Sequence, residues 1–229
     1  MIKIGNIIKI KNNQTDNKKR FITEIINASA PNLDFYLMVI LSALMTSLGL
    51  IANNLALVIA GMIVAPLLSP ILAMSLATSI LGSKLFIRSL KILAVSFMLS
   101  ISVSFLVGMI FDFNIGEIDL IQKMNVSYLT LSIAVVAGIT ASYAWTRENS
   151  KDYLSGIAIA VTIIPPLSSI GISLAASDAS TVVQVFNFFL MNVFGIFLGG
   201  IFVFPVMRFY KVKKTVLKEI KKEENSLTS

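Results

Sequence analysis

The feature that most constrains this chain is a stretch of 49 residues, 35–83, that carries no charged side chain. Four further uncharged runs follow, at 92–111, 124–146, 153–177 and 179–207. A helix that rises about 1.5 Å per residue needs about 20 apolar residues to cross a hydrocarbon core of about 30 Å. The first run is therefore long enough for two crossings, and the other four hold one each. We predict an all-α, polytopic membrane protein with about six transmembrane helices.

The long first run must turn back somewhere, and Asn53-Asn54 is its only strongly polar pair. We therefore expect a tight turn there. Composition agrees with this class of protein, because only 14% of the residues are charged, against roughly a quarter in soluble domains. The predicted spans are 35–52, 55–80, 88–111, 125–145, 153–176 and 180–207.

The basic residues predict the orientation of these spans. If the N-terminus is cytoplasmic, 18 of the 19 Lys and Arg fall on the cytoplasmic side, in the tails 1–34 and 208–229 and in the loops after the second and fourth spans. Lys123 alone falls outside, where the loops carry Asp112, Glu117, Asp119 and Asp178. The positive-inside rule thus predicts a multi-pass protein of the cell membrane with both termini cytoplasmic.

The net charge of +7 belongs to residues that flank membrane spans. Such residues anchor a topology and touch anionic lipid headgroups. We therefore expect the lipid bilayer, and not nucleic acid, to be the partner of these charges.

Two similar proline motifs divide the 35–207 transmembrane domain into halves. The motif at Ala65–Ile71 reads APLLSPI and the motif at Ile164–Ile170 reads IPPLSSI. A shift of 99 positions aligns Pro66 with Pro165 and Ser69 with Ser168. We expect two repeats of three spans, at 35–111 and 125–207, with the middle helix of each broken by prolines. An odd number of spans per repeat makes the two repeats run in opposite directions, as in many secondary transporters.

Small residues recur every four positions on the third and sixth spans, and such spacing lets helix backbones approach closely. We predict helix packing at these positions and a homo-oligomer formed through the same faces. The residues are Ser96, Ser100, Ser104 and Gly108 on the third span and Gly195 and Gly199 on the sixth.

Both proline motifs are predicted to lie about 17 Å deep, near the bilayer midplane. Interrupted helices at corresponding positions of two repeats point to a central binding site. The alternative is that the prolines only kink helices for packing. The candidate site residues are Pro66, Ser69, Pro70, Thr162, Pro165, Pro166, Ser168, Ser169 and Asn192.

The interiors of the predicted spans contain no Asp, Glu, His, Lys or Arg. Proton relays, metal sites and intramembrane hydrolases need such groups, so we expect no enzyme, no metal site and no cofactor. Hydroxyl and amide oxygens remain. They can coordinate a monovalent cation or hydrogen-bond a neutral polar solute, and the N-termini of half-helices could hold an anion.

The residues Gly61–Ile71, GMIVAPLLSPI, resemble the signature Gly-Ala-Met-Leu-Ile-Ala-Pro-Leu-Met-Gly-Pro-Ile of the uncharacterised hydrophobic domain family, domain of unknown function 389. The residues Gly156–Leu167 resemble the second signature of the family, Gly-Val-Ala-Ile-Ala-Val-Ala-Leu-Val-Pro-Pro-Leu, and Asn192 falls where the family tends to place an asparagine. Ser69 and Thr162 depart from the family's glycine and alanine and add hydroxyls at the breaks. The resemblance implies the polytopic fold over about 35–205 and assigns no activity.

The leading hypothesis is a small transporter or channel-like protein that binds a small solute or ion between the two breaks. Its rival is a scaffold or sensor that does not transport and whose cytoplasmic tails recruit a partner. A third possibility, an intramembrane enzyme, would need a catalytic acid or base from the loops.

Overall fold

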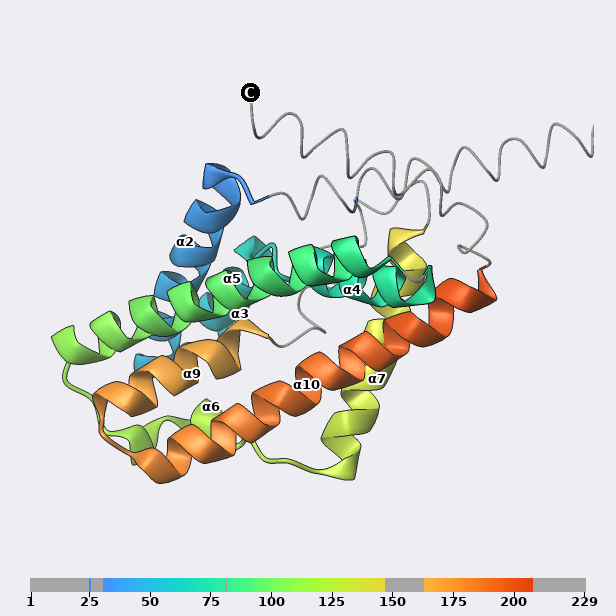
Figure 1. Ribbon diagram of the computed structural model, residues 1–229. Helices are drawn as coiled ribbons and strands as arrows, with labels where there is room; N and C mark the ends of the chain where they lie inside the picture. The colour runs from blue at the N-terminus through green and yellow to red at the C-terminus, as the bar shows by residue number, and fades with distance from the viewer. Residues whose placement is uncertain (1–24, 26–30, 81, 147–162, 208–229) are drawn as a thin grey trace, which may run out of the picture.

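The computed structural model describes residue 25 and residues 31–80, 82–146 and 163–207. In these ranges the chain forms eight α-helices, one short 3₁₀ helix and no strand, so the predicted all-α class is confirmed (Figure 1). The helices are α2 (Leu33–Ile51), α3 (Leu55–Val64), α4 (Leu68–Ser79), α5 (Ser83–Ile110), η1 (Ile115–Glu117), α6 (Asp119–Gln122), α7 (Tyr128–Trp145), α9 (Ile164–Ala175) and α10 (Ala179–Val206).

Four of these helices, α2, α5, α7 and α10, are long and apolar enough to cross a membrane. The pair α3 and α4 passes the same test together and is bent by 50° at its break. The predicted fifth span, 153–176, lies partly outside the described residues, and α9 is its described part. The tail 208–229 and most of the tail 1–34 also lie outside them. The structure therefore gives four spans and a bent fifth, and the count of six stays a prediction.

Polar side chains set where the helices begin. Asn53 has a positive φ of 48°, so the predicted turn at Asn53-Asn54 is confirmed. Helix α7 begins three residues later than predicted because Ser127 is its cap. Four caps accept a hydrogen bond from the backbone N–H three residues on: Asn32 from Phe35 at 2.9 Å, Asn54 from Leu57 at 3.2 Å, Ser127 from Thr130 at 3.1 Å and Asp178 from Thr181 at 3.2 Å.

The two 28-residue helices, α5 and α10, organise the packing. In Figure 1 they run in opposite directions across the molecule. Helices α4 and α9 each pack against both of them, while α2 packs on α5 and α7 on α10. Helix α9 also contacts α2 and α3, so it lies deep among its neighbours.

The distribution of side chains is that of a membrane protein. Large apolar side chains point outward, including Met98 (68% exposed) and Phe202 (68%), while Ser96, Ser100 and Ser104 are fully buried. Small and hydroxyl side chains inside and apolar ones outside are expected where the solvent is lipid. Together with the spanning helices, this arrangement indicates a multi-pass membrane protein.

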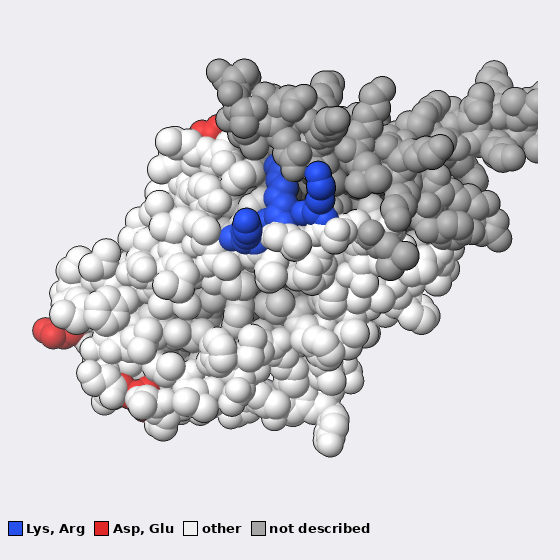
Figure 2. Space-filling view, in the orientation of Figure 1, with Lys and Arg blue, Asp and Glu red and all other residues white. Residues whose placement is uncertain are grey.

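The loops predicted to be outside share one end of the molecule. Asn53 donates from Nδ2 to the carbonyl of Glu117 (2.7 Å) and accepts from the backbone N–H of Asp119 (3.2 Å). The start of α10 joins them, because Gln184 donates to the carbonyl of Met124 (3.1 Å). Figure 2 shows the basic side chains of the visible face in a single patch away from this end.

Candidate functional site

The first proline motif interrupts a span. Ala65, which precedes Pro66, has an extended backbone (φ −69°, ψ 121°) and ends α3. A residue before proline is driven out of the helical region by the proline ring, which accounts for the break. The hydroxyl of Ser69 donates to the carbonyl of Pro66 (3.0 Å). This break is therefore stabilised from within its own motif.

The other three motif prolines lie in the first turns of helices. Pro70 is the third residue of α4, and Pro165 and Pro166 are the second and third residues of α9. A backbone N–H in the first turn of a helix has no partner inside the helix, so proline is tolerated there and frees no carbonyl. Each of these prolines thus lies in the first turn of a described helix. The predicted proline break of the span 153–176 stays a prediction, because residues 147–162 lie outside the described residues. Thr162 lies outside the described residues.

Three serines of α9 form the most unusual polar group in the described part of the chain. Ser168, Ser169 and Ser173 are each 0% exposed, and their hydroxyls have no hydrogen-bond partner there. In other helices several buried serines donate to the carbonyl four residues back, as Ser96 does to Ile92 (2.8 Å). Ser89 of α5 and Ser142 of α7 are also buried without a partner among the described residues, but each is the single such serine of its helix. Helix α9 thus differs from the other described helices in carrying three such hydroxyls together, which are available to a ligand.

Every residue from Ile164 to Ser173 is buried. The helix that carries these hydroxyls is therefore enclosed on all sides by protein, at the position where α2, α3, α5 and α10 meet. The hydroxyl of Thr46, on α2, is likewise buried and unpartnered among the described residues. Thr46 was not among the predicted site residues, although its spacing of four from Ser42 places both on one face of α2.

Asn192, a predicted site residue on α10, is 3% exposed. Its amide donates to the carbonyl of Phe188 on the same helix (2.9 Å). Its amide group is thus engaged in a local hydrogen bond. Phe188 itself lines a cavity of about 210 Å³ together with Pro165 and Pro166.

This cavity lies at the N-terminal end of α9. Its walls are almost wholly apolar, and Lys123 is the charged residue among them. It joins the start of α9 to the end of the molecule that holds the loop 111–127. The remaining lining residues are Leu55, Val58, Met62, Leu120 and Met124.

The predicted packing residues lie at helix contacts inside the chain. A Cβ added at Gly108 would lie 2.7 Å from Cβ of Ala175, and one added at Gly195 would lie 2.5 Å from Cβ of Ala134. Gly199 faces α7 in the same way, with the carbonyl oxygen of Val135 2.5 Å from the added atom. Ser96, Ser100 and Ser104 are buried on α5. These faces are occupied within one chain, so a homo-oligomer would have to use others.

Helix α4 meets α10 through Ser75. Its hydroxyl donates to the carbonyl of Phe197 (3.2 Å). A Cβ added at Gly200 would lie 2.6 Å from Cβ of Ser75. The backbones of the two helices are therefore as close here as a glycine allows.

Helix α9 meets α5 through Gly171 in a matching contact. An added Cβ would lie 2.5 Å from the carbonyl oxygen of Ile101 and 2.6 Å from Cβ of Ser104. In the contact of α4 with α10 the corresponding residues are Ser75 for Gly171, Phe197 for Ile101 and Gly200 for Ser104. The residue numbers of each pair differ by 96. The bounds of α4 and α9, and those of α5 and α10, also differ by 96 at both ends.

Comparison with known proteins finds a family model, described as a domain of unknown function (DUF389), that matches residues 62–198. An uncharacterised protein of Methanocaldococcus jannaschii, MJ0678, is 30% identical over 182 residues, which are 80% of this chain and 56% of the relative. The chain thus spans little more than half the length of that relative. No solved structure matches this chain. The chain belongs to the DUF389 family, as the resemblance of its two proline motifs indicates.

Proposed function

We propose that the chain is a small transporter or channel-like membrane protein, without enzymatic activity, that binds a monovalent cation or a small neutral polar solute beside α9. The observation that carries the proposal is the group of fully buried, unpartnered hydroxyls of Ser168, Ser169 and Ser173. A buried polar group left without a partner costs about 1–3 kcal/mol. Three of them on one helix are therefore better explained by a bound ligand or water than by packing.

The equivalent contacts support an inverted repeat. Helices α4 and α5 correspond to α9 and α10 at an offset of 96 residues, and α5 and α10 run in opposite directions (Figure 1). This offset of 96 residues differs from the offset of 99 residues at which the proline motifs align. It pairs Pro70 with Pro166. Repeats of opposite direction with interrupted middle helices are typical of secondary transporters, whose sites lie between the repeats.

The chemistry of α9 favours a cation or a neutral solute over an anion. The positive end of a helix binds anions through its free N–H groups. Pro165 and Pro166 lack an N–H, and the N–H of Leu167 is directed to the carbonyl of Ile163 (3.4 Å). The first turn of α9 therefore has few N–H donors for an anion, whereas its serines offer hydroxyl oxygen atoms that can accept hydrogen bonds or coordinate a cation.

The 210 Å³ cavity supplies a route toward this helix. It is lined by Pro165 and Pro166 on one side and by residues of the 111–127 loop on the other. We infer that solute enters from the end of the molecule where that loop lies and reaches the hydroxyls along α9.

Flux into proteoliposomes tests the proposal. Purified protein is reconstituted and uptake of rubidium, sodium and glycerol is followed. The variant S168A/S169A removes two unpartnered hydroxyls and is expected to lower the flux of the transported species by about tenfold or more, since 1.4 kcal/mol is worth a factor of ten. The matched variant S96A/S100A removes two buried serines whose hydroxyls donate to backbone carbonyls of α5 (2.8 and 2.9 Å), and its flux is expected to stay within about twofold.

Equal loss of flux in both variants would show that the serines act through stability alone. Absence of flux in the wild-type protein, while truncation of 208–229 abolishes a cellular phenotype, would favour the scaffold or sensor. Because the chain contains no cysteine, S168C also reports directly on access. It should react with a small charged thiol reagent that leaves S96C unmodified.

A further inference from the structure

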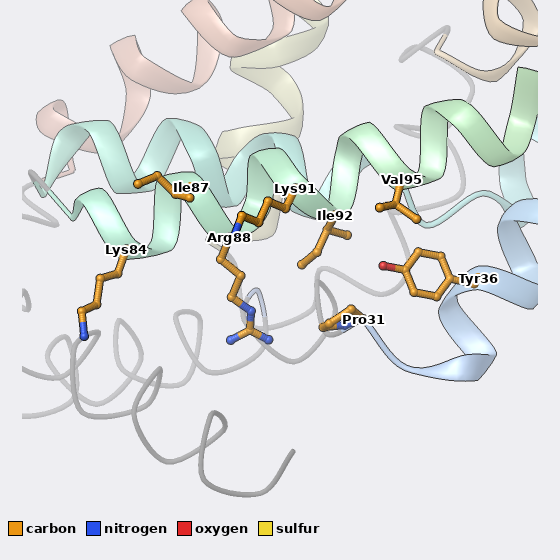
Figure 3. A pocket seen from close by; sticks show the side chains of 8 residues that line it. All are labelled: Pro31, Tyr36, Lys84, Ile87, Arg88, Lys91, Ile92 and Val95. Atoms are coloured by element: carbon orange, nitrogen blue, oxygen red, sulfur yellow. The ribbon is translucent and has the colours of Figure 1, made fainter. Parts of the chain in front are cut away.

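Lys123 stands apart from the other basic residues that the structure describes. Lys84, Arg88 and Lys91 line a cavity of about 520 Å³ at the start of α5, and Figure 3 shows Lys84 and Arg88 extending from this helix to the same side. Lys123 instead lines the 210 Å³ cavity at the start of α9. It is also the one Lys or Arg of 19 that the charge pattern places outside. The positive-inside rule gives no reason for a lysine there, so a topological role does not account for it.

Neighbouring residues hold Lys123 at this cavity. Ile121 is 0% exposed and Met124 7%, so the chain is anchored on both sides of the lysine. The carbonyl of Met124 also accepts a hydrogen bond from Gln184 of α10 (3.1 Å). Lys123 itself is exposed, while Met124 lines the cavity with it. The lysine therefore lies at the mouth of the cavity, between its apolar walls and the surrounding water.

Lys123 is the single charged residue that lines this cavity. No hydrogen bond or ion pair joins its ammonium group to another described residue. The carboxylates of the same loop, those of Asp112, Glu117 and Asp119, are not among the lining residues, and the rest of the lining is apolar. Like charges repel more strongly beside apolar walls than in bulk water, because such walls screen them less. A lysine in this position raises the barrier for a cation, as fixed charges do in selective pores.

The interior beyond the cavity also offers a cation no counter-charge. Among the described residues, the buried polar side chains are those of serine, threonine and asparagine, with no carboxylate. A charge that is buried without a partner of opposite sign costs far more free energy than a buried neutral group that is hydrogen-bonded. The interior of the described part of the chain is therefore better suited to a neutral solute.

The hydroxyls of Ser168, Ser169 and Ser173 favour a solute that carries hydroxyl groups of its own. A serine hydroxyl has one O–H donor and two acceptor lone pairs, and none of these three has a partner in the described part of the chain. A cation would occupy only the lone pairs and leave the donors unpartnered. A neutral solute with several hydroxyl groups can both accept from these serines and donate to them.

The size of the cavity sets an upper limit on that solute. Cavities that hold drug-sized ligands have volumes of about 300–1,000 Å³, whereas this one has about 210 Å³. A molecule of the size of glycerol suits it better than a disaccharide or a nucleoside.

We propose that the solute is a small neutral molecule with several hydroxyl groups, and that Lys123 is the residue that excludes cations at the mouth of the 210 Å³ cavity. The inference rests on the proposed function and narrows its two classes of solute to one. An anion, which Lys123 would attract, finds few N–H donors in the first turn of α9. Charge is thus rejected at the mouth or at the helix, and hydroxyl groups are recognised beyond both.

Access of thiol reagents to S168C tests the role of Lys123, since the chain has no cysteine of its own. The probes are 2-hydroxyethyl methanethiosulfonate, which is neutral, and 2-(trimethylammonium)ethyl methanethiosulfonate, which is a permanent cation. Each rate is divided by the rate of the same reagent with free cysteine. The preference for the neutral reagent is expected to fall by about fivefold or more in K123Q/S168C, the order of effect of one unit charge at close range near a protein surface. K123R/S168C keeps the charge and should keep the preference.

The matched control is A176E/S168C. It lowers the net charge by one unit, as K123Q does, at an exposed position that does not line the cavity. Its preference is expected to equal that of S168C. An unchanged preference in K123Q/S168C, or an equal fall in A176E/S168C, would overturn the role of Lys123. Thermal unfolding of each variant checks that it is folded.

Uptake by proteoliposomes tests the class of solute and separates this inference from the proposed function. The wild-type protein is expected to accelerate glycerol uptake over that of protein-free vesicles and to leave rubidium uptake at the protein-free rate. Acceleration of rubidium without glycerol would overturn the neutral class and leave transport beside α9 in place. No acceleration of either solute, together with no reaction of S168C with either reagent, would overturn the proposed function itself.

Discussion

Asp178 shows what a single side chain contributes at a helix start. Its carboxylate accepts hydrogen bonds from the hydroxyls of Ser180 and Thr181 (both 2.6 Å) and from their backbone N–H groups (3.1 and 3.2 Å). These hydrogen bonds, that from the Ser180 hydroxyl foremost, lower the pKa of Asp178 from 3.8 to about 2. Because the folded pKa is the lower one, the stabilisation is complete above about pH 4 and is lost as the pH falls toward 2.

We expect D178N to separate the cap from its charge. Asparagine caps a helix nearly as well as aspartate, so the unfolding temperature at pH 7 should change little. Between pH 4 and pH 2 the wild type should lose more stability than D178N does, since the other carboxyl groups titrate in both. Circular dichroism of the detergent-solubilised protein at the two pH values measures the difference. The same acid-induced loss in both proteins would refute the assigned role.

The serines show how much of the candidate site could be predicted from single residues. Ser96 and Ser168 are both buried serines within helices, and the sequence separates them only by the proline motif in which Ser168 lies. One donates to its own helix and the other has no partner in the described part of the chain. The difference arises from what surrounds α9, which a sequence pattern does not contain. The candidate hydroxyls could be named from the sequence, but not ranked.

At the level of helices, close contact through glycine holds α9 to α5. Gly171→Ala would bring a methyl group to within 2.5 Å of the carbonyl oxygen of Ile101. Overpacking of this kind typically costs about 1–3 kcal/mol, so the unfolding temperature should fall clearly. Gly200→Ala, at the equivalent contact of α4 with α10, should have a comparable effect.

The control for both variants is Gly116→Ala in the loop, where the nearest atom to an added Cβ, Oδ1 of Asn114, is 3.4 Å away. Its unfolding temperature should match that of the wild type. Thermal unfolding followed by circular dichroism compares the three variants. Tolerance of alanine at Gly171 together with sensitivity at Gly116 would contradict the packing described here.

The described ends of the predicted spans lie within about five residues of the prediction, because capping and charge mark them. The predicted start of the third span at residue 88 is five residues late, since the helix begins at Ser83 and carries Lys84 with it. Proline was harder to interpret. Pro66 separates two helices, whereas Pro165 and Pro166 lie inside the first turn of one. A proline can therefore follow the end of a helix or lie in the first turn of one, and its presence in the sequence does not say which.

At the scale of the whole molecule, hydropathy and charge predict the class and the arrangement of the loops, because the bilayer imposes both. The register of the proposed repeat was not predictable in the same way. The proline motifs align at 99 residues, while the contacts of Ser75 and Gly171 align at 96. A proline motif can occupy slightly different positions in the first turn of a helix. A close contact between two helix backbones allows no such change, so it is the better guide to which residues correspond.

The orientation of the molecule in the cell membrane is the last prediction. The loop 111–127 and the start of α10 lie at one end, and the basic residues of α5 lie away from it. Since the chain has no cysteine of its own, single cysteines report each position without background. Asp112, Ala176 and Lys84 are exposed positions suited to replacement.

In intact cells a membrane-impermeant thiol reagent should label D112C and A176C, and it should label K84C only after the cells are made permeable. The reason is that basic residues resist transfer across the membrane and hold their end of each helix in the cytoplasm. The reverse pattern would invert the molecule and place the entrance to the 210 Å³ cavity in the cytoplasm. Labelling of D112C and A176C on different sides would separate two loops that the structure places together, and the predicted topology would then be wrong.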